Sequence, residues 1–113
     1  MELFHYTSKD GFKSISSQMT WLFRATKPPG GHRLAAYFTD YDERTKNLAL
    51  KLRIPKRKLA YFFKFDDGNH VQSRVLKRLP GARGRHIFYS EADYPVEPGR
   101  QIYRGPRPSE AHQ

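Results

Sequence analysis

The stretch KLAYFFKF, residues 58–65, constrains the fold of this chain more than any other. Its side chains alternate, with Leu59, Tyr61, Phe63 and Phe65 on one side and Ala60, Phe62 and Lys64 on the other. A period of two residues is that of a β-strand whose two faces meet different surroundings. A chain of 113 residues forms one domain, and its eight Phe, seven Tyr and one Trp supply much of a core. The sequence therefore predicts one folded domain.

Other segments are placed by the same patterns. Strands are predicted at residues 2–6, 35–39, 85–90 and 100–105, with a further short apolar run at 21–23. Ser8 is expected to cap a helix that begins near Lys9, with an inward stripe formed by Phe12, Ile15 and Met19. Asp40 and Glu43 have the spacing of a capping box for a second helix, with Tyr41, Leu48 and Leu50 on its apolar face and Pro55 at its end.

The remaining segments are loops, turns and one ambiguous stretch. Residues 24–35 carry two prolines and two glycines and are predicted to be a loop, and residues 66–69 a turn. Val71, Val75, Leu76 and Leu79 have helical spacing, although the valines also allow a strand. The element order predicts an α+β domain without βαβ alternation, covering residues 1–105, and a disordered tail at 106–113.

The charge of the chain points to a polyanionic partner. The formal net charge is +10. Residues 51–64 hold six Lys and Arg and no acid, and residues 70–86 hold five Lys and Arg and two His without an acid. Acids gather instead at 40–43, 66–67 and 91–97. Such clustering favours one face that attracts nucleic acid, an acidic protein or a phosphorylated ligand.

Several kinds of site are disfavoured by the sequence. The chain has no cysteine, which excludes disulfides, thiolate nucleophiles and cysteine-based zinc sites. The five histidines are scattered without the spacing of a ligand pair, so no metal is expected. Apolar runs fall short of the ~18 residues of a membrane span, and the N-terminus lacks a signal-peptide pattern. A Rossmann fingerprint and a P-loop are absent as well.

Two short motifs carry the chemistry. HYT (5–7) ends a predicted strand directly before a helix, and YFTD (37–40) ends the next predicted strand. An acid follows in the late segment PVEPGR (95–100). Taken with LFHYTSKDGFKSI, AAYFTD and PVEPGRQIYRG, these motifs resemble ADP-ribosyltransferase toxin domains of the His–Tyr–acid type. The resemblance is to the small bacterial group with a His-Tyr-Asp signature, and it spans about residues 2 to 105.

The resemblance implies a fold and a set of roles. The fold would be a split β-sandwich that holds NAD between two sheets. His5 would hydrogen-bond the adenosine ribose, Thr7 would support the same region, and Tyr37 would stack on the nicotinamide. Tyr6 and Phe38, which flank these residues, complete the expected NAD-binding set. For the carboxyl group at the nicotinamide ribose, Glu97 is the first choice, with Asp93 and Asp66 as rivals, because family members often carry an aspartate in this segment.

The chemistry itself asks for these residue types. Breaking the nicotinamide–ribose bond develops positive charge on the ribose, as in glycoside hydrolysis. A nearby carboxylate stabilises that charge, and such groups are each worth roughly 10²–10³ in rate. The resemblance thus implies a monomeric mono-ADP-ribosyltransferase with NAD as co-substrate and no metal. It would be the effector part of a larger secreted toxin, acting in the cytoplasm of a target cell and held in check by a cognate immunity protein. The excess positive charge suggests an anionic acceptor such as RNA or DNA.

Two other functions fit the sequence. A small basic ribonuclease toxin would use His5, His70 or His86 for acid–base catalysis, with Lys and Arg at the phosphate. A nucleic-acid-binding module without catalysis would stack bases on the aromatic side chains of residues 62–65.

Overall fold

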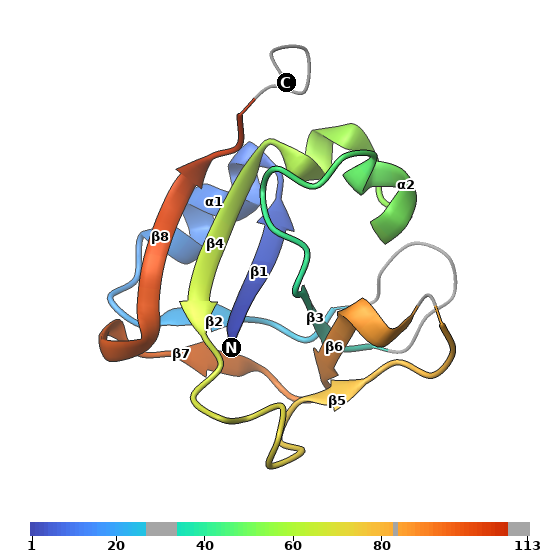
Figure 1. Cartoon of the computed structure of the whole chain (residues 1–113). Coiled ribbons are helices and arrows are strands. Elements are labelled where there is room, and N and C mark those ends of the chain that lie inside the picture. The colour runs from blue at the N-terminus through green and yellow to red at the C-terminus, as the bar shows by residue number, and fades with distance from the viewer. Residues whose placement is uncertain (27–33, 83, 109–113) are drawn as a thin grey trace.

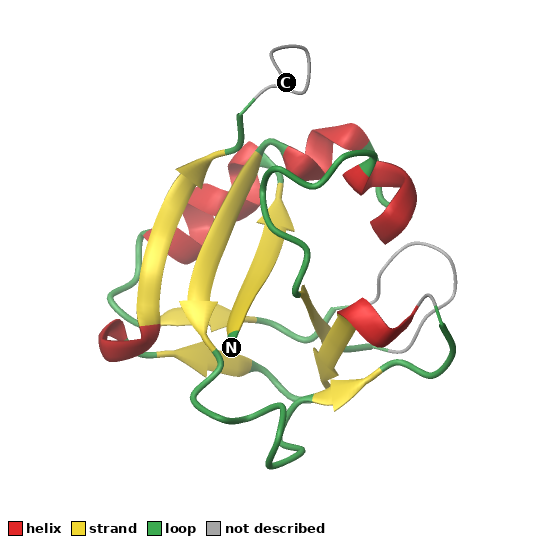
Figure 2. Cartoon of the chain, viewed as in Figure 1, coloured by secondary structure: helices red, strands yellow, loops and turns green. Residues whose placement is uncertain are grey.

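The described residues form one α+β domain in which eight strands build a six-stranded antiparallel sheet and a two-stranded sheet, shown in Figures 1 and 2. The computed structural model describes residues 1–26, 34–82 and 84–108. The large sheet contains, in spatial order, β5 (Lys77–Arg78), β6 (Ile87–Ser90), β3 (Ala36–Thr39), β1 (Glu2–Thr7), β4 (Tyr61–Asp66) and β8 (Gln101–Pro106). The small sheet pairs β2 (Trp21–Phe23) with β7 (Tyr94–Val96).

Within the described residues, five short helical segments connect these strands. The α-helices are α1 (Lys9–Ser16) and α2 (Leu48–Leu52). The 3₁₀ turns are η1 (Lys56–Leu59), η2 (Gly84–His86) and η3 (Pro98–Arg100). Figure 1 shows β1, β4 and β8 side by side in front of α1, while β3, β6 and β5 lie together on the other side of β1.

The two faces of the large sheet bury two separate clusters. One face packs Leu3, Phe63 and Phe65 together with Trp21, Phe23, Tyr94 and Val96 of the small sheet. The opposite face packs Phe4, Tyr6 and Phe62 against Leu48 and Leu59. Alternate residues of β1 and β4 thus enter different cores, which confirms the predicted period of two for residues 61–65. The start of the prediction is wrong, because residues 58 and 59 belong to a 3₁₀ turn and Leu59 packs with Phe62 on the opposite face.

The first predicted helix is confirmed in position but is shorter than expected. The Ser8 side chain accepts a hydrogen bond from the Gly11 amide at 3.3 Å, as an N-cap does. Phe12 and Ile15 pack against the core as predicted. Met19, the third residue of the proposed stripe, is 83% exposed because α1 ends at Ser16.

Gly11 supports the junction between β1 and α1, because Cβ of any other residue there would lie 2.1 Å from Oγ1 of Thr7. We expect Gly11→Ala to lower the free energy of unfolding by about 1–3 kcal/mol, measured by urea denaturation. The double variant Thr7→Ala/Gly11→Ala removes the clashing oxygen. It should be at least as stable as Thr7→Ala, since alanine favours a helix by about 1 kcal/mol over glycine. Unchanged stability of the single variant would contradict this packing.

The second predicted helix is wrong in its start and its apolar face. The capping box does not form, because Asp40 binds His86 at 2.7 Å and residues before α2 form turns. The helix begins only after Asn47, whose φ is 57°. Leu48 is buried as predicted, whereas Leu50 is 77% exposed.

The segment 71–79 is not a helix. The Leu76 amide donates to the His70 carbonyl at 3.0 Å, and Arg74 adopts a left-handed backbone with φ 65°. Leu76 is buried by this turn, and the chain then forms the edge strand β5. The valine alternative, a strand, is confirmed only for Lys77 and Arg78.

The last segment of the chain differs from prediction in two ways. β7 lies inside the acidic stretch 91–97, for which the sequence predicted no strand, and it forms because Tyr94 and Val96 are buried opposite β2. β8 continues to Pro106, and the Arg107 amide donates to the Ala60 carbonyl at 2.8 Å. The predicted tail therefore includes two residues that are packed on the domain, and 109–113 lie outside the described residues.

Candidate functional site

The sheet is interrupted between β1 and β3. Over the described part of the chain, these strands pair at Phe4 and Thr39 only, whereas β1 pairs with β4 along its whole length. On the Tyr37 side of this pair, the imidazole of His5 takes the place of a ladder hydrogen bond, with Nδ1 3.0 Å from the carbonyl oxygen of Tyr37. This contact brings together His5 and Tyr37, the residues of the first two sequence motifs, which were predicted to act together.

The hydrogen bond fixes the state of His5. A carbonyl can only accept, so Nδ1 carries the proton and donates it, and Nε2 of the neutral ring is an acceptor. Burial, opposed by the Tyr37 carbonyl and aided by the charge of Lys58, lowers the pKa of His5 to about 4. The ring packs on Phe23, with centroids 4.7 Å apart. At neutral pH the His5 ring is therefore uncharged and fixed in position, with Nε2 as a hydrogen-bond acceptor.

Tyr37 and Thr7 flank the interruption. The ring of Tyr37 is half-buried and lies 6.1 Å from that of Tyr89 on β6. Because side chains alternate along β3, this ring projects from the face opposite Phe38, the residue whose ring neighbours His5. Thr7 is half-buried at the end of β1. A ligand would reach His5 and Tyr37 together only where the two strands separate.

Tyr6 and Phe38 are core residues rather than ligand-facing ones. Phe38 is 2% exposed and packs edge-on against Phe23 and Phe65. Tyr6 is 8% exposed, donates its hydroxyl hydrogen to the Tyr41 carbonyl at 2.7 Å and has a raised pKa, mainly because of burial. Both predicted NAD contacts thus support the site by packing.

Glu97, the predicted catalytic acid, belongs to a network at the end of β7. Its carboxylate accepts from Arg100 Nε at 2.7 Å, which lowers its pKa. Arg100 also donates to the Tyr94 hydroxyl and to the Asp66 and Pro95 carbonyls. β7 pairs with β2, so this network is not on the strands that carry His5 and Tyr37.

The two rival acids have local structural partners. Asp93 accepts a hydrogen bond from the Ala25 amide at 2.8 Å, which ties the start of β7 to the segment that follows β2. Asp66 accepts from the Gly68 amide at 2.8 Å and shapes the turn after β4. These contacts account for both carboxylates without a ligand.

A third acid, Asp40, lies directly after β3 and was missed as a site residue. Its Oδ1 is 2.7 Å from His86 Nδ1, and the Tyr41 ring stacks on the imidazole with centroids 4.4 Å apart. The Arg85 guanidinium donates to His86 Nε2 at 3.1 Å. Its capping-box spacing concealed this role, since a partner 46 residues away leaves no local signal.

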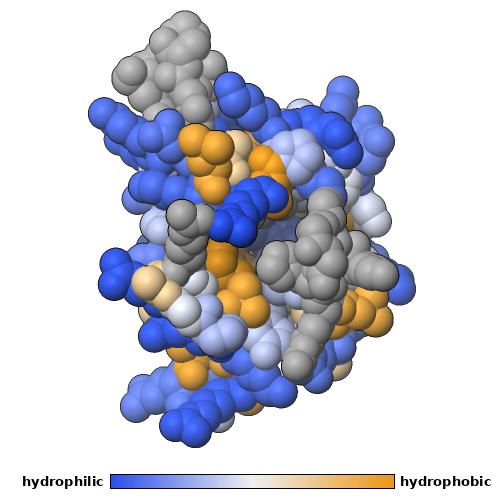
Figure 3. All heavy atoms as spheres, turned by 90° about the vertical axis from the view of Figure 1, so that its right-hand side faces the viewer, coloured by the Kyte–Doolittle hydropathy of each residue, from blue (hydrophilic) through white to orange (hydrophobic). Residues whose placement is uncertain are grey.

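This acid–histidine pair adjoins a basic pocket. Tyr41, Leu50, Lys51 and Arg53 line a hollow of about 480 Å³, and the Lys51 ammonium lies 5.3 Å from the Tyr41 ring centroid. Figure 3 views the side of the molecule on which α2 and η2 lie. The surface there is mainly hydrophilic, with small apolar areas and a hollow near its centre.

The three histidines of the ribonuclease hypothesis are in separate surroundings. His5 is among core aromatics, His86 binds Asp40, and His70 Nδ1 lies 2.5 Å from the Tyr94 hydroxyl. They do not form one constellation in the described residues, so any ribonuclease centre would rest on His86 with Asp40. The other two histidines of the sequence, His32 and His112, lie outside the described residues.

Across residues 1–26, 34–82 and 84–108, no three His, Cys, Asp or Glu side chains gather as metal ligands would. Helices in that same part of the chain are too short or too polar to cross a membrane. No protein-family model matches the sequence, and comparisons with curated proteins and with solved structures found no significant match.

Proposed function

We propose that the chain is an NAD-dependent ADP-ribosyltransferase whose NAD site is the interruption between β1 and β3. The observation that supports this proposal best is the hydrogen bond from His5 to the Tyr37 carbonyl at 3.0 Å, where the strand ladder stops. It brings the His and Tyr motifs together although 32 residues separate them. In this proposal the sheet is the split β-sandwich of that enzyme class.

In this mechanism each side chain has one task. Nε2 of His5, an acceptor in the neutral ring, holds a ribose hydroxyl. The Tyr37 ring contacts the nicotinamide, and the half-buried Thr7 closes the end of the site. The bond from nicotinamide to ribose then breaks, the electron pair leaves with nicotinamide, and the positive charge develops on the ribose. An acceptor nucleophile attacks that carbon and loses its proton.

We assign the carboxylate that stabilises this charge to Asp40. It follows Tyr37 by three residues, and its hydrogen bond with His86 fixes it at the end of β3. Glu97, the first choice from the sequence, is 57% exposed in an ion pair with Arg100. An exposed ion pair of this kind fits a surface role better than a preorganised one.

The carboxylate assignment predicts a clear difference between two variants. Asp40→Asn should lower nicotinamide release about 100-fold, because a preorganised charge is lost. Glu97→Gln should stay within about 3-fold of the parent chain, since it removes an ion pair worth roughly 1 kcal/mol or less. Release is measured with NAD labelled in the nicotinamide ring, and circular dichroism checks the fold. The opposite ranking of the two variants would return the role to Glu97.

The class itself is tested by incubating the chain with labelled NAD and with RNA, DNA or protein acceptors. The proposal expects nicotinamide release and, with the right acceptor, a covalent ADP-ribose adduct. Neither release nor adduct under any of these conditions would refute it. A toxin role, a target-cell site of action and a cognate immunity protein are part of the same proposal and follow from the family resemblance alone.

A ribonuclease is the second candidate, and the Asp40–His86 pair favours it specifically. A carboxylate on Nδ1 orients an imidazole for acid–base work, and Arg85, Lys51 and Arg53 supply nearby cations. His86→Asn separates the two functions, because its amide nitrogen replaces Nδ1 toward Asp40 but cannot transfer protons at neutral pH. If the parent chain cleaves RNA without NAD and His86→Asn does not, the protein is a ribonuclease. If His86→Asn still turns over NAD, the result supports the transferase.

A further inference from the structure

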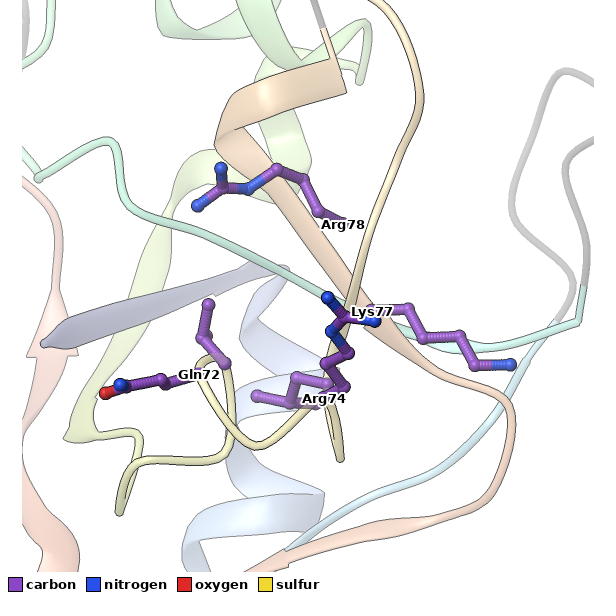
Figure 4. Close-up of a pocket in the computed structure, with 6 residues that line it drawn as sticks. Gln72, Arg74, Lys77 and Arg78 are labelled. Carbon is purple, nitrogen blue, oxygen red and sulfur yellow. The ribbon is translucent and has the colours of Figure 1, made fainter.

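A second basic hollow lies beside the edge strand β5, which is separated from β3 by the strand β6. It encloses about 430 Å³ and is lined by Val71, Gln72, Arg74, Leu76, Lys77 and Arg78. We call it the β5 hollow. Figure 4 shows Arg78 and Gln72 on different sides of this hollow, while the Lys77 side chain extends away from both. Its cations thus come from one short stretch of chain on the rim of the large sheet.

Positive charge in the β5 hollow is poorly neutralised. Lys77 is 3.4 Å from Glu91, and both side chains are about half exposed. Within the described residues, Arg74 and Arg78 have no ion-pair partner. No Asp or Glu occurs between residues 68 and 90. Two guanidinium groups therefore remain available for an anion.

Both guanidinium groups come from positions that the fold defines. The Arg78 guanidinium lies 5.0 Å from the centroid of the buried Phe88 ring, opposite it in the β5–β6 ladder. The backbone of Arg74 is held in a left-handed turn, with its amide donating to the Val71 carbonyl at 3.2 Å. A defined position lowers the entropy lost when such a long side chain binds a ligand.

The lining combines apolar and cationic groups. Leu76 is 2% exposed and Val71 packs against the main core, so the apolar part of the lining is fixed. Arginine binds phosphate through two parallel N–H donors, which lysine cannot do. A nucleotide needs this combination, because its phosphate is anionic while the faces of its base and sugar are largely apolar. An acidic peptide would use the guanidinium groups and leave the apolar surface uncovered.

We propose that the β5 hollow binds single-stranded nucleic acid, with a backbone phosphate on Arg74 and Arg78 and the adjoining nucleoside against the half-buried Val71. Single-stranded binding sites commonly pair a basic groove with apolar surfaces in this way. This interaction requires no NAD and holds whether or not the proposed transferase activity exists. Under the transferase proposal, it would bring a nucleic acid acceptor to the enzyme.

The test compares two double variants with equal loss of charge. Arg74→Gln/Arg78→Gln changes the β5 hollow, and Lys56→Gln/Arg57→Gln changes exposed cations of η1. Fluorescence anisotropy measures the affinity of each chain for labelled single-stranded 12-mers of RNA and of DNA at several salt concentrations. We expect the hollow variant to lose at least 10-fold in affinity and the η1 variant less than 3-fold.

The salt dependence gives a second readout. Losing the one phosphate contact that Arg74 and Arg78 share should reduce the slope of log affinity against log salt by about 0.7. Equal losses in both variants would overturn the proposal, because they would indicate general attraction by net charge. The proposal would also be overturned if the parent chain did not bind the labelled 12-mers, or if polyglutamate displaced them as well as unlabelled single-stranded nucleic acid does. Thermal melting confirms that both variants remain folded.

Discussion

His5→Asn is expected to lower NAD turnover about 100-fold while leaving the sheet intact. Asparagine carries its amide nitrogen on Cγ, as histidine carries Nδ1, so it can still donate to the Tyr37 carbonyl that His5 binds at 3.0 Å. It has no counterpart of Nε2, the atom that the mechanism assigns to a ribose hydroxyl. Loss of one such preorganised contact costs roughly 10²–10³ in rate. Nicotinamide release and calorimetric titration of NAD measure the two effects.

His5→Gln is the matched control, because its terminal amide extends toward the place of Nε2, where its oxygen can accept, and it no longer donates to the Tyr37 carbonyl. We expect this variant to be the less stable of the two, since a half-buried carbonyl at the strand interruption loses its donor. If the His5→Asn variant turns over NAD as fast as the parent chain, the proposed role of Nε2 is refuted. If the His5→Asn variant is unfolded, the imidazole of His5 is needed for packing against Phe23.

The lowered pKa of His5 adds a pH signature. The folded chain binds the His5 proton only near pH 4, whereas an unfolded histidine binds it near 6.5. Stability from this residue is therefore complete above pH 6.5 and falls as pH drops toward 4, by at most about 1.4 kcal/mol per pH unit. His5→Asn should lack this part of the decline. NAD binding should not change between pH 5.5 and 8 through His5, because the ring stays neutral throughout.

Asp67→Ala is expected to be the most destabilising of the changes considered, by about 2–4 kcal/mol. The side chain of Asp67 is 4% exposed, and it accepts from the Met1 ammonium at 3.0 Å and from the Val71 and Asn69 amides at 3.0 and 3.2 Å. Hydrogen bonds to a charged acceptor are each worth roughly 1.5–3 kcal/mol, and the truncation leaves the donors without it. Urea denaturation at pH 7 measures the loss.

Asp67→Asn and low pH provide the control. The amide keeps one acceptor oxygen and the shape of the side chain, so we expect a smaller loss than for alanine. Hydrogen bonds from Val71, Met1 and Asn69 lower the pKa of Asp67 despite its burial. Its contribution is therefore present above pH 3.8 and disappears as pH falls through the lower folded value. This account would be contradicted if the variants differed from the parent chain in free energy of unfolding as much at pH 2 as at pH 7.

Local patterns in the sequence were sufficient where a residue's surroundings are set by its near neighbours. The alternation in residues 58–65 predicted a strand, and residues 61 to 66 form it because period two places every second ring in the same core. Ser8 caps α1 through a bond to a residue three positions away. The juxtaposition of the His and Tyr motifs was expected from a family resemblance, and His5 does bind the Tyr37 backbone.

Tertiary structure alone decided the rest, because the partners lie far apart in the chain. Asp40 has the spacing of a helix cap, yet His86 offers it a charge-assisted partner 46 residues away, and the helix starts later. Tyr94 and Val96 sit in an acidic stretch, and only pairing with β2 gives their apolar side chains a place to be buried. Spacing within a segment indicates which residues can lie on the same face of a strand or helix. Burial against distant strands determines which element forms and which residues contact it.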